Sequence, residues 1–211
     1  IREWNLSPET IVDRATVGKW SVDAFLEQKV DTQHWINGND NAMAGNGLQT
    51  SRAVEGFLPE MLKSLYEERA RYKGLMDEAT ATREQLDKSD PQYAILTDQI
   101  AAFNNQQLVR KVNLNSAYGA LGSEYFRFYD THLAEAVTLT GQMVIRWVAK
   151  NVNAFLNTQF KTEADYVIAS DTDSIYVRLE PLIDLFKSKK PDATIDQCVT
   201  VLARFCDAHL E

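Results

Sequence analysis

The chain is organised around one stretch, which reads Ala169-Ser170-Asp171-Thr172-Asp173-Ser174-Ile175-Tyr176-Val177. Apolar and β-branched residues flank its acidic centre on both sides, and they predict two short strands. The Asp-Thr-Asp-Ser run between them predicts a tight turn, because Asp and Ser side chains satisfy turn backbone with their own oxygens. The stretch therefore predicts a β-hairpin that carries Asp171 and Asp173 at its tip.

Two acids at one turn repel each other unless a cation lies between them. Carboxylate oxygens are hard ligands that suit magnesium or manganese. Asp-rich turns are also common in proteins that bind no metal, so the turn alone leaves both interpretations open. An EF-hand is excluded, because the third ligand and the glycine that its loop requires after Asp173 are absent. The choice between a metal site and a plain turn therefore depends on the rest of the chain.

Composition bounds the class of protein. The chain has 211 residues, of which 45% are hydrophobic and 25% charged, as is typical of a soluble globular protein of one or two domains. A net charge of −8 argues against binding nucleic acid through bulk electrostatics, but a local basic surface is compatible with it. No apolar run is long enough to span a membrane, and residues 1–4 do not resemble a signal peptide. We therefore expect a cytoplasmic protein without a membrane partner, in which Cys198 and Cys206 are reduced thiols.

Upstream of the acidic turn, the hydrophobic pattern predicts a pair of long helices. Apolar residues recur every three or four positions from Pro59 to about Asp87, and proline suits a first helical turn. A break at 88–91 separates this helix from a second pattern that ends at Tyr118. Two long helices joined by a short turn predict an antiparallel hairpin. Residues 1–56 carry turn signals and no long period, so we expect short strands and loops there.

A third long helix is predicted from Leu133 to Asn157, directly before the acidic hairpin. We interpret its apolar stripe as core: Leu139, Met143, Val144, Trp147, Val148 and Phe155. Short helices at 181–187 and from 195 onward complete the chain. The predicted class is therefore α+β. It combines a small antiparallel sheet with helices and an antiparallel two-helix hairpin.

Polar residues recur at helical spacing on the predicted two-helix hairpin. Arg69 and Lys73 are four positions apart on the first helix. On the second helix, Asn115 follows Lys111 by four positions and Tyr118 follows by three more. If the two faces meet, three cations and an amide converge, as a polyphosphate requires, because its oxygens need charge-assisted donors. Solvated side chains on a purely structural hairpin are the alternative that spacing alone leaves open.

Two motifs resemble those of family B DNA polymerases. Residues 111–119 read Lys-Val-Asn-Leu-Asn-Ser-Ala-Tyr-Gly and resemble the family's Lys-x-x-x-Asn-Ser-x-Tyr-Gly motif. Residues 171–174 resemble its Asp-Thr-Asp-Ser motif, and the two motifs follow the family's order. Within the family, segments 6–11, 126–130 and 141–143 are most similar to the replicative polymerases of T-even-type bacteriophages.

The resemblance implies a right-hand polymerase reduced to part of its palm and its fingers. The palm would comprise residues 1–58 and 123–211, and the fingers residues 59–122. Asp173 would bridge two Mg²⁺ ions, which Mn²⁺ can replace, and Asp171 would tune their coordination. The implied catalytic residues are thus Asp173, Asp171 and Lys111. The residues implied to bind the incoming nucleotide are Arg69, Lys73, Lys111, Asn115, Tyr118 and Gly119.

The implied activity is template-directed transfer of a nucleotide from a dNTP to a primer 3′-hydroxyl. Its implied partners are primer-template DNA, the remaining polymerase with exonuclease and thumb, and a sliding clamp, in an infected bacterial host cell. Two departures from the family pattern accompany this resemblance. Ala169-Ser170 stands where the family has Tyr-Gly, and the family's Asp-x-x-Ser-Leu-Tyr-Pro motif is absent. We therefore expect that the chain starts just after that motif and is inactive alone.

Two other hypotheses remain open from the residues themselves. A non-catalytic helical-hairpin adaptor that binds another protein would explain the acidity and the helical spacing. A calcium-stabilised structural domain would explain the acidic turn. Neither hypothesis explains two motifs that occur together in one order.

Overall fold

The structure, a computed structural model, describes residues 1–30 and 41–209. They form an α+β chain with small antiparallel sheets and long helices, which confirms the predicted class. The chain divides into two compact units, residues 1–140 and 141–211, and each is described by itself. Among the helices so described, none combines the length and the apolar character needed to cross a lipid bilayer.

The first unit contains a three-stranded antiparallel sheet in the order β1-β3-β2. Its strands are β1 (Ile11–Asp13), β2 (Asn41–Met43) and β3 (Gln49–Ser51). A short helix, α1 (Val22–Leu26), follows β1. Gly47 turns the chain between β2 and β3 at φ +87°, where a Cβ would lie 2.4 Å from the Thr16 carbonyl oxygen. Short strands and loops were predicted for this region, of which residues 31–40 lie outside the described residues.

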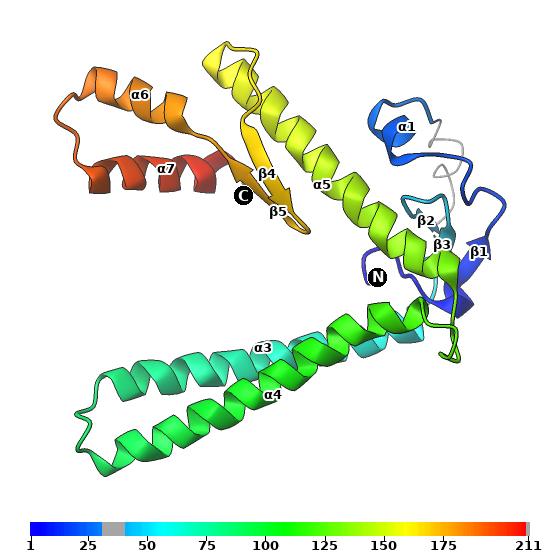
Figure 1. The fold of residues 1–211 in the computed structure, drawn as a ribbon, viewed down its shortest axis with the longest axis horizontal. Helices are drawn as coiled ribbons and strands as arrows, with labels where there is room; N and C mark the ends of the chain where they lie inside the picture. Colours follow the sequence, from blue (N-terminus) through cyan, green and yellow to red (C-terminus); the bar gives the residue numbers. More distant parts are fainter. Residues whose placement is uncertain (31–40, 210–211) are drawn as a thin grey trace. The chain divides into compact units, whose positions relative to one another are not determined.

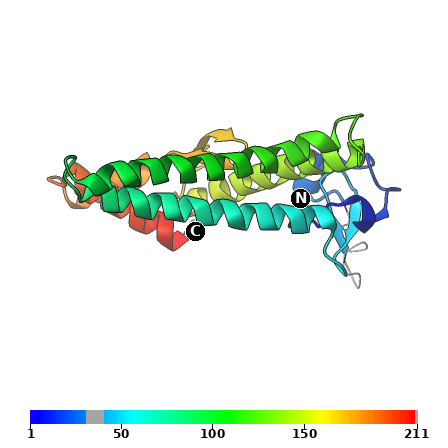
Figure 2. The same ribbon diagram turned by 90° about the horizontal axis from the view of Figure 1, so that it is seen from below.

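Two long helices, α3 (Phe57–Glu84) and α4 (Pro91–Leu121), run antiparallel and side by side (Figures 1 and 2). Asp90 caps α4, because its side chain accepts a hydrogen bond from the Gln92 amide at 2.8 Å. The predicted hairpin is therefore confirmed. α3 ends at Glu84 rather than Asp87, and α4 continues to Leu121 rather than ending at Tyr118.

The core of the first unit lies at the base of the helical hairpin. It combines side chains from the N-terminal segment, the β2–β3 turn, both ends of the hairpin and the start of α5 (Thr131–Phe160). Burial of one such leucine contributes about 1.5–3 kcal/mol. This core holds the first turns of α3 and the last turn of α4. Its buried members are Leu6, Ala44, Leu48, Leu58, Leu121, Leu133 and Ala136.

The second unit contains the acidic hairpin and a pair of helices. Its elements are the remainder of α5, β4 (Val167–Asp171), β5 (Ser174–Val177), α6 (Glu180–Lys189) and α7 (Ile195–His209). Tyr166 is buried just before β4, and its ring lies 5.6 Å from that of Phe160. Cys198 is buried and Cys206 is half-buried, and both are free thiols as predicted.

The predicted core stripe of α5 is correct only in part. Four of its members are half-buried: Leu139, Met143, Val148 and Phe155. Val144 is 40% exposed and Trp147 is 58% exposed, and the fully buried apolar positions of this helix are Leu133, Ala136 and Leu156. Each end of α5 packs within its own unit, so the buried positions gather at the two ends. A continuous apolar stripe is expected where one core covers a whole helix. The start of α5 belongs to the first compact unit and the remainder to the second, so the helix packs against two separate cores.

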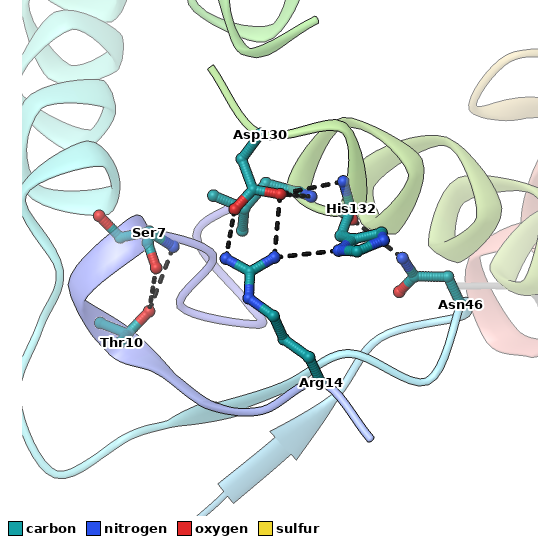
Figure 3. Close-up of polar contacts among 7 residues, drawn as sticks. Ser7, Thr10, Arg14, Asn46, Asp130 and His132 are labelled. Carbon is teal, nitrogen blue, oxygen red and sulfur yellow. Dashed lines mark hydrogen bonds and ion pairs between the residues drawn. The ribbon is translucent and has the colours of Figure 1, made fainter. Parts of the chain in front are cut away.

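An ion pair joins the end of β1 to the start of α5 (Figure 3). Arg14 donates to the two carboxylate oxygens of Asp130 at 3.1 and 2.5 Å. Asp130 also accepts hydrogen bonds from the His132 and Leu133 amides at 3.0 and 3.3 Å, so it caps α5. Burial opposes ionisation of Asp130, but the hydrogen bonds from Arg14 and the helix amides outweigh it and lower its pKa. The role of Asp130 is therefore structural.

Asp130→Asn is expected to lower the free energy of unfolding at pH 7 by roughly 1.5–3 kcal/mol, since it weakens charge-assisted hydrogen bonds. The pKa of Asp130 in the folded protein lies below 3.8, the ordinary value of an Asp side chain. Its stabilising effect is therefore complete above that pH and is lost as pH falls through the folded pKa. Urea unfolding of parent and variant at pH 7 and pH 3 should show a smaller difference at pH 3. Asp98→Asn, at an exposed acid of α4, is the control.

Candidate active site

The acidic stretch forms the predicted hairpin, with both acids at its tip. β4 and β5 pair antiparallel, Asp171 lies opposite Ser174, and Thr172 and Asp173 form a two-residue loop. The Asp173 amide donates to the Asp171 carbonyl at 2.6 Å, and the Ser174 hydroxyl donates to the same oxygen at 3.0 Å. Both hydrogen bonds form within the turn, and Asp171 and Asp173 are exposed to solvent.

The two carboxylates differ in their contacts. Asp171 Oδ1 accepts a hydrogen bond from the Thr172 hydroxyl at 3.0 Å. The Asp173 carboxylate has no hydrogen-bond or ion-pair partner anywhere in residues 1–30 and 41–209. Of the two acids, Asp173 is thus the more available anion.

The loop backbone carries strain at Thr172. Its φ of +51° lies in the left-handed region, where a β-branched residue costs about 1–2 kcal/mol relative to the ordinary helical conformation. A two-residue hairpin loop demands positive φ, which is why glycine and asparagine are common there. Ser170, in contrast, pairs regularly with Ile175 and has no positive φ. The serine that replaces the family's glycine therefore fits an ordinary strand.

The chemistry of this turn suits a divalent metal, but the turn offers too few ligands to complete the coordination of one. Asp171 and Asp173 offer hard oxygen donors of the kind that Mg²⁺ prefers. Over the described part of the chain, no group of three or more His, Cys, Asp or Glu side chains could hold a metal ion. Mg²⁺ is octahedral, and a two-ion site needs acids on both sides of the ions. The described residues therefore supply only part of such a site.

The predicted cations lie on the helical hairpin. The antiparallel pairing of α3 and α4 places them at similar positions along its axis. Leu62 and Tyr66 of α3 line the same cavity of about 340 Å³ as Leu114 of α4. Arg69 follows Tyr66 by one helical turn, and Lys111 precedes Leu114 by one turn. With a rise of about 1.5 Å per residue, these two cations lie within roughly two turns of each other along the hairpin.

The side chains of this set differ in exposure. Lys73, Lys111 and Asn115 are exposed, and Tyr118 is 39% exposed. Arg69 is half-buried, and its Nε atom is buried without a hydrogen-bond partner among the described residues. Among those residues, no hydrogen bond or ion pair joins Arg69 or Lys73 of α3 to Lys111. A shared nucleotide-binding role for the set, including Gly119 on α4, stays a prediction.

The acids and the cations belong to different compact units. Asp171 and Asp173 lie within 141–211, whereas the hairpin cations lie within 1–140. The structure therefore gives the geometry of each group separately.

Sequence reasoning missed Arg110, which joins the two helices of the hairpin. Its Nε donates to Glu68 of α3 at 2.8 Å, and its guanidinium lies 4.5 Å from the centre of the Tyr72 ring. It also donates to Gln106 at 2.6 Å. In the antiparallel register of the folded helices, position 110 lies opposite 68 and 72, one residue before the motif lysine. Sequence periodicity does not fix that register.

Comparison with known proteins places these features in one family. Residues 1–190 match the family model "DNA polymerase family B". The chain is 28% identical over 250 aligned residues to the DNA-directed DNA polymerase of Escherichia phage RB69, covering 100% of this chain and 27% of that protein. It is 45% identical over 82 residues to the corresponding enzyme of Enterobacteria phage T4, covering 38% of this chain and 9% of that protein.

A solved structure is also similar. The family B DNA polymerase of Pyrobaculum calidifontis superposes with a TM-score of 0.46 at 24% identity, covering 90% of this chain and 20% of that one. The chain spans about a quarter of the length of its RB69 relative, which is the 27% coverage given above. The match over residues 1–190 confirms the resemblance that the two motifs indicated. The chain therefore belongs to DNA polymerase family B.

Proposed function

We propose that this chain is part of a template-directed DNA polymerase, which transfers a nucleotide from a dNTP to a primer 3′-hydroxyl. The observation that carries the proposal is the exposed hairpin tip with Asp171 and Asp173, in a chain that belongs to this family. The unpartnered carboxylate of Asp173 supports its assignment as the principal metal ligand. In this proposal residues 59–122 are the fingers, and residues 1–58 and 123–211 belong to the palm.

The helical hairpin would bind the triphosphate. Arg69, Lys73 and Lys111 supply positive charge, and converging charge-assisted donors stabilise the negative charge that develops on transferring phosphates. Asn115 and the Tyr118–Gly119 pair would line the pocket of the nascent base pair. The exposure of Lys73, Lys111 and Asn115 supports this assignment, since each side chain is accessible to a ligand.

Bound Mg²⁺ ions would lower the pKa of the primer hydroxyl and stabilise the pyrophosphate leaving group, and Mn²⁺ would substitute. Asp173 would hold the metal, and Asp171, oriented by the Thr172 hydroxyl, would tune its coordination. Primer-template DNA would be the macromolecular substrate. We further infer that the remaining parts of the polymerase, with exonuclease and thumb, and a sliding clamp act with this chain in the cytoplasm of an infected bacterial cell.

A titration of Mn²⁺ against nucleotide binding tests the proposal. Anisotropy of a fluorescent dNTP should show binding that requires the metal, and Mn²⁺ should bind the chain at the acidic turn. Absence of nucleotide binding at saturating metal would contradict the proposal.

A helical-hairpin adaptor is the second candidate, and exposed apolar side chains on α4 favour it. Ile95 is 57% exposed, Leu108 47%, Val109 55% and Val112 54%. Scattered exposed apolar residues are normal on soluble proteins, so this observation weighs less than family membership. The same titration separates the candidates, because the adaptor binds neither metal nor nucleotide. A calcium-stabilised structural domain would bind Ca²⁺ and gain thermal stability without binding nucleotide.

Asp173→Asn is expected to weaken Mn²⁺ binding more than Asp171→Asn does. The Asp173 carboxylate has no competing partner among the described residues, whereas that of Asp171 accepts the Thr172 hydroxyl. Removal of the free anion takes away more of the attraction for a cation. Electron paramagnetic resonance of free Mn²⁺ gives both affinities. Equal losses, or a greater loss for Asp171→Asn, would contradict the assignment.

A further inference from the structure

The segment Ser7-Pro8-Glu9-Thr10 has no part in the acidic turn or the cationic set, yet it contacts the start of α3. α3 begins after Gly56, which occupies the capping position and has no side chain with which to cap. The first amides of a helix have no partner inside the helix and need an acceptor from elsewhere. The acceptors for α3 come from this segment, about fifty residues upstream.

Glu9 and Ser7 together supply the cap. Glu9 Oε1 accepts a hydrogen bond from the Phe57 amide at 2.6 Å, and Ser7 Oγ accepts a longer one from the Leu58 amide at 3.4 Å. The Ser7 hydroxyl donates to the other Glu9 oxygen at 2.6 Å, which orients the carboxylate. We call this arrangement of Ser7, Glu9, Phe57 and Leu58 the α3 cap.

The surroundings hold the α3 cap in one position. Ser7 is fully buried, and a Cβ on Gly56 would lie only 2.5 Å from the Ser7 Cβ, so the two backbones meet closely there. Asn5 accepts a hydrogen bond from the Gly56 amide at 2.8 Å and donates to the carbonyls of Ser51 and Val54. The start of α3 is therefore tied to the N-terminal segment and to the end of β3.

The charge of Glu9 suits its place. Its carboxylate lies at the positive end of the α3 dipole, where an anion is stabilised. Burial opposes ionisation, but the hydrogen bonds from Ser7 and the Phe57 amide prevail and lower the pKa of Glu9. The side chain is thus ionised at neutral pH.

We propose that Glu9 is a positioning residue for nucleotide binding, which acts by fixing the first turn of the helix that carries Arg69 and Lys73. This inference rests on the proposed function. α3 is one continuous helix of 28 residues, so a change of direction at its start is carried along its length. Arg69 lies twelve residues beyond Phe57, about 18 Å along the axis, where a tilt of roughly 10° displaces it by about 3 Å. Misplacement by about 1 Å already weakens function at a preorganised site.

Three variants test this role. Glu9→Ala removes the α3 cap, Glu9→Gln keeps an oxygen that can accept from the Phe57 amide, and Glu60→Ala removes an exposed acid from the same first turn. Two quantities are measured: hydrogen exchange of the first α3 amides, and the affinity for a fluorescent dNTP with Mg²⁺. Urea unfolding and Mn²⁺ binding serve as checks on global stability and on the acidic turn.

For Glu9→Ala we expect exchange at Phe57 and Leu58 to rise about fivefold, as loss of a helix cap does, and nucleotide affinity to fall about 3- to 10-fold. Mn²⁺ affinity should not change. Glu9→Gln should keep both the exchange rate and the nucleotide affinity close to those of the parent chain. Glu60→Ala should change neither quantity. Faster exchange in Glu9→Ala with unchanged nucleotide affinity would reduce Glu9 to a plain cap and overturn the positioning role. If the parent chain binds no nucleotide, the proposed function fails instead, and the positioning role falls with it.

Discussion

Purified by itself, the 211-residue chain is expected not to extend a primer in the presence of Mg²⁺ and all four dNTPs. Asp171 and Asp173 come from one turn, and the described residues add no third acidic, His or Cys ligand around them. Ions held from one side only are bound weakly and without the fixed separation of about 3.5–4 Å that a two-metal site requires. In-line attack by the primer hydroxyl then has no fixed geometry.

A gel-based primer-extension assay decides this prediction, with the Asp173→Asn variant as the matched control. Steady template-directed extension that Asp173→Asn abolishes would mean that another acid of the chain completes the site. Asp130 is a poor candidate for that role, because Arg14 and the first amides of α5 already occupy its oxygens. Asp13 and Asp23 would then be replaced by Asn in turn. Extension that persists in Asp173→Asn would come from a contaminating polymerase.

Lys111→Ala is expected to weaken dNTP binding by about 10- to 150-fold, while binding of primer-template DNA changes much less. The range corresponds to the loss of one charge-assisted contact, about 1.5–3 kcal/mol. Lys111 is exposed on α4 and has no ion-pair partner within the described residues, so its removal leaves no buried group unsatisfied. The loss should therefore appear in ligand affinity and not in the free energy of unfolding.

Isothermal titration with a dNTP and Mg²⁺ measures the effect of Lys111→Ala. Lys88→Ala is its control, because it removes the same charge from the exposed turn between α3 and α4. Arg110→Ala is a useful contrast, since Arg110 contacts Glu68 and Tyr72 and should affect stability first. Equal nucleotide affinity in the parent and Lys111→Ala would contradict the assignment of the motif lysine.

Local sequence pattern was sufficient for the long helices and the acidic β-hairpin of this protein, but it did not place the individual strands of residues 1–56. The β-hairpin at Asp171 and Asp173 follows from turn chemistry between two β-branched runs, and both interactions act over a few residues. The helical hairpin follows from a period of three to four residues, a proline at each helix start and a polar break. The order of two short motifs was sufficient for the family, which the match over residues 1–190 confirms.

Element ends were less predictable. α3 begins at Phe57, two positions before Pro59, because Glu9 and Ser7 accept hydrogen bonds from its first amides. Residue spacing within 57–84 carries no information about an acceptor near position 9. Two of the six predicted core positions of α5, Val144 and Trp147, are exposed for a related reason, since periodicity reports an apolar face but not which part of it another segment covers.

The fold class, the helical and β-hairpins, the acidic tip and the family were predictable from residue pattern, because each depends on short-range chemistry or on the order of motifs. Three contacts became known only from the folded chain: Asp130 pairs with Arg14, Arg110 joins α3 to α4, and Glu9 caps α3. Those contacts join residues 42 to 116 positions apart. Long-range partners of this kind are selected by packing of the whole chain, which no local window of sequence contains.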